Sequence, residues 1–354
     1  MTLNRHLARD ADEVIRQLGD LAARFSGAKV LVTGAAGFLG AHFVHGFLRL
    51  NDCGVLAEPC RLVAIDNFLR GVPSWLGALR ERPDLELRQA NIVQTQEFGP
   101  TNFIVHAASL ASPTYYRQFP IETMDANVIG LRNLLEFARR QPVQGFLYFS
   151  TSEIYGDPDA AHIPTAETYR GNVSCTGPRA CYDESKRFGE TLCVAFAQVH
   201  KVPVVVVRPF NNYGPGLMLG DRRVLPDFFR DALKGKDITL LSDGTATRTF
   251  CYSSDAMTGY LRALLLGRAG ESYNIGSDRP EISMRDLARQ VVEVAGTGVG
   301  VSYRQSDDKH YLTDNPQRRC PDLGKARAEL GYAPRVSLRD GLTRMLEYYR
   351  DDAE

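Results

Sequence analysis

The chain has 354 residues, 44% of them hydrophobic, and its 42 basic and 42 acidic residues give a formal net charge of zero. This length allows two domains or one large domain with a lobe. The charge balance argues against nucleic acid or an anionic membrane as a partner. Seven scattered cysteines without CxxC spacing predict neither a disulfide framework nor a metal site. A cytoplasmic, reducing compartment fits this composition best.

Residues 1–27 are predicted to form a helix that leads into the first strand. Charges interrupt every apolar run there, so we expect no signal peptide, and no stretch of the chain approaches transmembrane length. The helix could pack on the body of the protein or on a second subunit. Its apolar residues recur at helical spacing: Leu3, Leu7, Val14, Ile15, Leu18, Leu21, Ala22 and Phe25.

Apolar, β-branched runs alternate with helical patterns between residues 28 and 210. The predicted strands are 28–34, 60–66, 85–91, 102–109, 145–152 and 202–210, and the predicted helices are 38–50, 121–140 and 183–200. This alternation predicts an α/β fold, a Rossmann-type doubly wound parallel sheet with helices on both faces. After Arg208, loops rich in Gly, Pro and Asp predict a smaller C-terminal substrate-binding lobe. We therefore expect a cofactor domain at 28–208 and a lobe at 209–350, with some exchange of chain between them.

The stretch VLVTGAAGFLGAHFV places Gly34, Gly37 and Gly40 between a strand and a helix. Glycines allow a tight turn and let backbone N–H groups approach a pyrophosphate. Asp66 ends the next strand, where a carboxylate accepts hydrogen bonds from the adenosine ribose and favours NAD over NADP. Arg70 nearby leaves an opening for NADP. A glycine turn alone is a weak signal, but the order strand, glycines, helix, strand and Asp indicates a dinucleotide site.

Tyr182 and Lys186, in ACYDESKR, are spaced to share one face of a helix. A nearby ammonium stabilises a phenolate, which would let Tyr182 act as a general base on an alcohol. The alternative is an ordinary amphipathic helix that happens to carry both residues.

The glycine turn and the Tyr/Lys pair together resemble the extended short-chain dehydrogenase/reductase family over residues 28–350. The resemblance implies that NAD contacts Gly34, Gly37, Phe38, Leu39, Gly40, Asp66, Asn67, Asn91, Ile92, Ala107, Ala108, Ser109, Tyr182 and Lys186. It also implies that Tyr182 and Lys186 are the catalytic pair and that Thr151 contacts the C4 hydroxyl of the substrate.

Within that family the sequence looks most like the UDP-glucuronate decarboxylases, through segments such as YRGNVSCTGPRACYDESKR, RPFNNYGPG and DNPQRRCPDL. Related 4,6-dehydratases read Thr-Asp-Glu where this chain reads Thr151-Ser152-Glu153. A serine cannot replace the carboxylic acid that dehydration needs, so Ser152 and Glu153 favour decarboxylation. The resemblance implies the following substrate contacts: Ser112, Tyr115, Arg179, Asn211, Asn212, Arg223, Arg248, Tyr252 and Arg319.

Several alternatives stay open at this point. Glu153 could be a cap or ion-pair residue, each arginine could be solvated, and Tyr252 could belong to the core. Leu110, Tyr115, Leu241, Gly216 and Cys320 depart from the decarboxylase pattern, which leaves the sugar and the base open. A 4-epimerase, a 4,6-dehydratase and a non-catalytic NAD-binding regulator are the competing functions.

The family resemblance also implies a homodimer built on the helices at 121–140 and 183–200. We expect its apolar contacts to come from Leu131, Leu134, Leu135, Phe188, Leu192 and Phe196.

Overall fold

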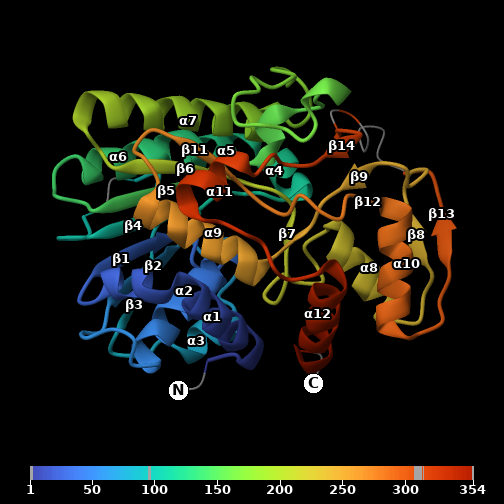
Figure 1. Ribbon diagram of the computed structural model, residues 1–354, viewed down its shortest axis with the longest axis horizontal. Coiled ribbons are helices and arrows are strands. Elements are labelled where there is room, and N and C mark those ends of the chain that lie inside the picture. Colours follow the sequence, from blue (N-terminus) through green and yellow to red (C-terminus); the bar gives the residue numbers. More distant parts are fainter. Residues whose placement is uncertain (1–2, 95–96, 307–312, 314, 353–354) are drawn as a thin grey trace.

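The computed structural model describes residues 3–94, 97–306, 313 and 315–352, and its centre is one parallel sheet of seven strands (Figure 1). Residues 307–312 of the predicted lobe and Asp314 of the segment DNPQRRCPDL lie outside the described residues. The strands, in the order β11-β6-β5-β4-β1-β2-β3, are β1 (Lys29–Thr33), β2 (Arg61–Asp66), β3 (Leu85–Gln89), β4 (Phe103–His106), β5 (Gly145–Phe149), β6 (Val204–Pro209) and β11 (Ser272–Ile275). β1 to β6 confirm the six predicted strands.

Helices cover both faces of this sheet, and alternate residues of each strand belong to two different hydrophobic cores. Val30 and Val32 of β1 belong to the core shared with α2 (Phe38–Asp52) and α9 (Ser253–Leu266). Leu31, between them, belongs to the core shared with α6 (Leu131–Ala138) and α7 (Ala180–His200). Figure 1 shows α7 and α6 on one side of the sheet and α2 and α9 on the other. Burial on both sides explains why the strands read as continuous apolar runs.

The strand order reverses between β1 and β4, which is where ligands bind in sheets of this kind. From β1 the chain proceeds outward to β2 and β3, then crosses back to β4 and continues to β5 and β6. Beyond β4 lie three short helical segments, α4 (Pro113–Gln118), α5 (Pro120–Asp125) and the π-turn η2 (Ala126–Gly130), which lead into α6. The carboxyl ends of β1 and β4 therefore face a common crevice.

The C-terminal lobe has a core of its own. It is built from α8 (Val224–Leu233), α10 (Met284–Ala295), α12 (Leu338–Asp352) and the paired strands β8 (Ile238–Leu240) and β13 (Val301–Tyr303). Two small sheets connect it to the crevice: β7 (Asn212–Tyr213) with β10 (Cys251–Tyr252), and β9 (Thr247–Arg248) with β12 (Ile282–Ser283) and β14 (Arg318–Arg319). The chain leaves this lobe to form α9, β11 and α11 (Gly324–Leu330) against the main sheet. Among the described residues, no helix has the length and apolarity that crossing a membrane requires.

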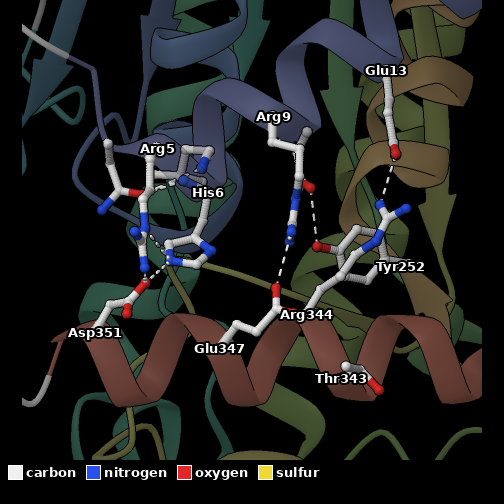
Figure 2. A network of polar contacts seen from close by, with 12 residues as sticks. Arg5, His6, Arg9, Glu13, Tyr252, Thr343, Arg344, Glu347 and Asp351 are labelled. Carbon is white, nitrogen blue, oxygen red and sulfur yellow. Dashed lines mark hydrogen bonds and ion pairs between the residues drawn. The ribbon is translucent and has the colours of Figure 1, made fainter.

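The predicted N-terminal helix is present as α1 (Arg5–Leu18), followed by the 3-10 segment η1 (Gly19–Phe25). Asn4 caps it by accepting the N–H groups of His6 and Leu7. Its buried face packs against α2 and α9 of the same chain, and its polar side chains reach α12 (Figure 2). Of the two locations left open, the structure therefore shows packing on the body of the protein.

The apolar residues predicted for a dimer contact are mostly committed to the chain's own core, so that prediction is wrong for four of the six. Leu131, Leu134 and Leu135 on α6 and Phe196 on α7 are at most 5% exposed, because they pack against the strands of the sheet. Phe188 is 50% exposed, and Leu192 is half-buried.

Candidate active site

The glycine turn between β1 and α2 leaves no room for side chains. Gly34 has a φ of +72°, and a Cβ there would lie 2.7 Å from the backbone of Ala108. A Cβ on Gly40 would lie 2.1 Å from the carbonyl oxygen of Gly34. α2 begins at Phe38 without a side-chain cap, so its first N–H groups are available to an anion. This cradle fits the pyrophosphate of a dinucleotide.

Asp66 lies beside the turn, at the carboxyl end of β2. Its carboxylate accepts the N–H of Ala36 at 3.0 Å and that of Phe68 at 2.8 Å. Burial raises the pKa of Asp66, although these backbone hydrogen bonds oppose the rise. The carboxylate is thereby fixed at the rim of the cradle, where a ribose hydroxyl can donate to it.

Arg70 is the residue that would allow NADP to bind in place of NAD. In the structure its side chain contacts loops on the substrate side of the crevice. Its guanidinium forms an ion pair with Asp221 and lies 4.8 Å from the ring centroid of Tyr115. Asp221 also accepts, through its backbone carbonyl, the hydroxyl of Ser112 at 3.1 Å. The structure thus brings Ser112 and Tyr115 together, and it ties both to the loop that follows Asp66.

The other predicted cofactor residues lie at the ends of β3 and β4. Asn91 accepts the N–H of Val93 at 3.1 Å and shapes the turn after β3, while the N–H of Ala107 donates to Thr33 and joins β4 to β1. The hydroxyl of Ser109 is buried, and within the described part of the chain it has no hydrogen-bond partner. A buried polar atom normally has one, so Ser109 fits a site that receives a polar ligand.

Tyr182 and Lys186 lie on the first turns of α7, and both are buried. The ammonium nitrogen of Lys186 donates to the carbonyl of Phe149 at 2.7 Å and lies 5.9 Å from the ring centroid of Tyr182. Burial raises the pKa of Tyr182 to about 12, partly offset by its hydrogen bond with Thr151. Burial also lowers the pKa of Lys186 to about 7. Both shifts disfavour the charged forms, so a charged Lys186 is needed to stabilise the phenolate of Tyr182.

Glu153 is held by two arginines that come from distant parts of the sequence. The two terminal guanidinium nitrogens of Arg319 donate hydrogen bonds to its carboxylate, at 2.6 and 2.5 Å, and Arg179 lies 2.5 Å from the same group. Burial would raise the pKa of Glu153, but the two arginines outweigh it and lower the pKa well below the ordinary range. Ser152, beside it in the segment η3 (Ser152–Tyr155), is buried as well. In this structure Glu153 is therefore an ion-pair residue, which was one of the alternatives left open by the sequence.

Asp183 and Tyr116 complete the site, and the sequence analysis missed both. Asp183 lies 3.6 Å from Arg179, and burial together with the charge of Glu153 raises its pKa. The ring of Tyr116 stacks on Tyr182 with centroids 5.0 Å apart and planes 9° from parallel. Asp183 lies four residues after Arg179, a helical pairing that could have revealed it. The stacking of Tyr116 follows from tertiary packing and has no such signal.

The remaining predicted substrate residues lie around the small sheets. Arg248 donates to backbone carbonyls of 316–317 and to Asn315, and burial together with Arg319 lowers its pKa to about 9. Asn211 donates to the carbonyl of Thr249 at 2.8 Å, and Asn212 accepts the hydroxyl of Tyr260. Arg223 precedes α8 and is half-buried.

Tyr252 is not brought to the site. It is 1% exposed, belongs to the core of the lobe, and donates its hydroxyl to Asp10 of α1 at 3.0 Å. Tyr252 is therefore a core residue and not the predicted substrate contact, since its hydroxyl is hydrogen-bonded to Asp10 on α1.

Comparisons with known proteins agree with this geometry. The family described as "NAD dependent epimerase/dehydratase family" matches residues 30–276. UDP-glucuronic acid decarboxylase 6 of Arabidopsis thaliana is 37% identical over 92% of this chain and 90% of its own. UDP-glucuronic acid decarboxylase 1 of Xenopus tropicalis is 37% identical over 92% of this chain and 73% of its own.

Among solved structures, a dTDP-glucose 4,6-dehydratase of Streptomyces venezuelae with NAD bound superimposes with a TM-score of 0.79. It is 28% identical, and the match covers 92% of this chain and 97% of that one. The glycine cradle, Asp66 and the Tyr182/Lys186 pair thus lie in a fold shared with enzymes of known cofactor. The chain belongs to the NAD-dependent epimerase/dehydratase family.

Proposed function

We propose that the protein is an NAD-dependent lyase that decarboxylates an NDP-uronic acid, converting UDP-glucuronate to UDP-xylose through a 4-keto intermediate. The observation that carries this proposal is the triplet Thr151-Ser152-Glu153 next to Tyr182, in which Thr151 and Ser152 are buried and Glu153 is half-buried. It supplies a hydroxyl and a carboxylate but no carboxylic acid where dehydration would need one. The names of the curated relatives support the same reaction.

The reaction begins with proton transfer to Tyr182. The phenolate of Tyr182 accepts the proton of the C4 hydroxyl, and Thr151 holds the same oxygen. The glycine cradle of Gly34, Gly37 and Gly40 would hold NAD, which would supply a reversible hydride acceptor for C4. The oxidised sugar is a β-keto acid, so its carboxylate leaves as CO2 and the electron pair is delocalised onto the new ketone. C5 is then protonated, and Tyr182 returns its proton to the C4 oxygen, so no cofactor is consumed.

The charge of the arginine cluster supports an acidic sugar. Arg179 and Arg319 bring two positive charges, and the lowered pKa of Glu153 keeps one negative charge between them. The raised pKa of Asp183 favours its neutral form. Arg248 adds a third positive charge that acts on the carboxylate of Glu153. The cluster therefore carries excess positive charge, and a uronate carboxylate would offset part of it. A neutral hexose would not.

Residues 28–208 would then be mainly the cofactor domain and 209–350 mainly the nucleotide-sugar lobe. Ser112, Tyr115, Asn211, Asn212, Arg223 and Arg248 remain proposed contacts of the nucleotide sugar. A non-catalytic regulator would not need the buried Tyr182 and Lys186 pair.

A second function is a 4-epimerase or 4,6-dehydratase acting on the same scaffold. It is favoured by the departures from the decarboxylase pattern, since one of them, Tyr115, lies under the guanidinium of Arg70 in the loop that follows Asp66. The test is incubation of the purified protein with a panel of NDP-uronates and NDP-hexoses, followed by mass spectrometry. A pentose nucleotide formed from a uronate supports decarboxylation. A 4-keto-6-deoxy product, or a C4 epimer that keeps its carboxyl group, supports the second function.

A homodimer completes the proposal. Ile121 on α5, Ile129 on η2 and Phe188 on α7 are 60%, 43% and 50% exposed, and α5 and η2 both pack against α7. A second copy of the chain would cover these side chains, and a strictly monomeric protein in light scattering at micromolar concentration would refute this. The free thiols of all seven cysteines support a cytoplasmic location.

A further inference from the structure

The N-terminal helix α1 lies outside the region 30–276 that matches the family, yet it contacts both halves of the molecule. On the cofactor side, Asp12 forms an ion pair with Arg49 of α2, with 2.7 Å between the nearest atoms. The backbone carbonyl of Gln17 accepts a hydrogen bond from Arg262 of α9 at 2.8 Å. These contacts fix α1 to the helices that cover one face of the main sheet.

On the other side, α1 is tied to α12 of the lobe by a row of ion pairs (Figure 2). Arg9 pairs with Glu347 at 3.0 Å, and Glu13 pairs with Arg344 at 2.8 Å. At the start of the helix, Arg5 and His6 both contact Asp351. α1 therefore spans the junction between the cofactor domain and the lobe.

Asp10 is the buried centre of this contact. Its side chain is 1% exposed, and its two oxygens accept the hydroxyls of Tyr252 at 3.0 Å and Ser253 at 2.8 Å. A buried carboxyl is destabilising unless its partners are held in good geometry. Tyr252 ends strand β10 and Ser253 begins α9, so Asp10 fixes the joint between them.

The joint leads directly to residues proposed to contact the nucleotide sugar. Within the parallel pair β10–β7, Cys251 is opposite Asn212. The N–H of Cys251 donates to the carbonyl of Asn211 at 3.2 Å. The segment after β7 also lies against α1, because a Cβ on Gly216 would be 3.8 Å from Leu7. A shift of β10 would therefore move Asn211 and Asn212.

We propose that α1 is an intramolecular brace, and that Asp10 is a positioning residue which sets the affinity for the nucleotide part of the substrate through β10 and β7. This inference rests on the proposed function, in which Asn211 and Asn212 contact the nucleotide sugar. Asp10 acts on the lobe side of the crevice through β10 and β7, whereas β1 and the start of α2 position the glycine cradle and α7 positions Tyr182. Loss of Asp10 should consequently weaken nucleotide-sugar binding more than it slows chemistry.

The test compares Asp10→Ala, Asp10→Asn and the control Arg16→Ala, an exposed position on the same helix. Four quantities are measured: the Kd of UDP by calorimetry, KM and kcat for UDP-glucuronate, and the NAD content of the purified protein. We expect Asp10→Ala to raise the Kd and the KM about tenfold, the effect of roughly 1.4 kcal/mol, with kcat and NAD content within about twofold. Asp10→Asn keeps an acceptor oxygen and should recover part of the affinity. Arg16→Ala should match the wild type.

An unchanged Kd for UDP in Asp10→Ala would overturn the brace, and so would equal losses in Kd, kcat and NAD content, which indicate general unfolding. Should Asp10→Ala fail to fold, the Kd of Glu13→Gln decides in the same way, because this variant weakens the contacts of α1 with Arg344 and Ser254. UDP binding separates this inference from the proposed function. A wild-type protein that binds UDP without decarboxylating UDP-glucuronate refutes the reaction and leaves the brace standing.

Discussion

Replacement of Glu153 by Gln tests whether two carboxyl groups share the arginines of the site. Asp183 has a raised pKa because of burial and because of the charge of Glu153. When that charge is removed, Asp183 should ionise and pair with Arg179, whose Nε lies 3.6 Å away. A pH of about 5 lies above the ordinary aspartate pKa of about 3.9 and below the raised pKa of Asp183. At this pH the cluster therefore carries the same net charge in the wild type and in Glu153→Gln.

Breaking a buried ion pair outright costs about 3–5 kcal/mol. Because Asp183 compensates, we expect Glu153→Gln to lose only about 1–2 kcal/mol of unfolding free energy at about pH 5. Asp183→Asn, which removes a neutral group, should lose less than about 1 kcal/mol. The double variant leaves Arg179 and Arg319 without a carboxylate and should lose the full amount, a coupling of about 2 kcal/mol.

Urea unfolding of the four proteins measures these values, and difference infrared spectroscopy follows the protonated carboxyl band of Asp183. That band should be present in the wild type at about pH 5 and absent from both single variants. Additivity of the two substitutions within about 0.5 kcal/mol, or a band that persists in Glu153→Gln, would show that Asp183 does not replace the charge of Glu153.

Three further predictions concern the base, the triplet and the brace. Tyr182→Phe keeps the stacking on Tyr116 but removes the ionisable hydroxyl. Turnover should therefore fall roughly 10²–10⁴-fold, with NAD and UDP binding retained. A variant that keeps more than half of the activity would exclude Tyr182 as the base. Ser152→Asp sets a second carboxylate beside Glu153 and should raise the KM for UDP-glucuronate while the NAD content is unchanged; an unchanged KM would place Ser152 away from the substrate carboxylate. Burial raises the pKa of Asp10 to about 7, while the hydrogen bonds from Ser253 and Tyr252 and the charge of Arg9 oppose the rise and Glu13 adds to it. The folded protein then holds this proton more tightly than the unfolded chain. The stability of the wild type relative to Asp10→Asn should therefore fall as the pH rises from about 4 to 7, by at most about 4 kcal/mol. A difference in urea unfolding free energy that does not change with pH would contradict this prediction.

Local patterns predicted the parts of the fold and the site that depend on neighbouring residues. β1 to β6 are continuous apolar runs because they are buried on both faces, and Tyr182 and Lys186 share a helix face through their spacing. β11 was missed because it is short and returns to the sheet only after the chain has passed through the lobe. Arg319 meets Glu153 across 166 positions, a contact that no local pattern encodes.

The error at Tyr252 has a specific cause. Asp10 lies on the buried face of α1, between Leu7 and Val14. A charged residue on that apolar face indicates a buried partner, and this signal points to a hydroxyl from elsewhere in the chain. The assignment of Leu131, Leu134 and Leu135 to a dimer contact was wrong for a related reason. Leu131, Leu134 and Leu135 do follow helical spacing, but periodicity does not distinguish a face that packs on the sheet from one that packs on a second subunit.

The most direct measurement of the central claim uses UDP-glucuronate labelled with ¹³C at the carboxyl carbon, incubated with the purified protein and no added reductant. Decarboxylation with an internal redox cycle should give one labelled CO2 and one unlabelled UDP-pentose for each substrate consumed, detected by NMR and mass spectrometry, with no accumulation of NADH. Label that remains in a nucleotide sugar of inverted C4 configuration, or CO2 release matched by stoichiometric NADH, would contradict it.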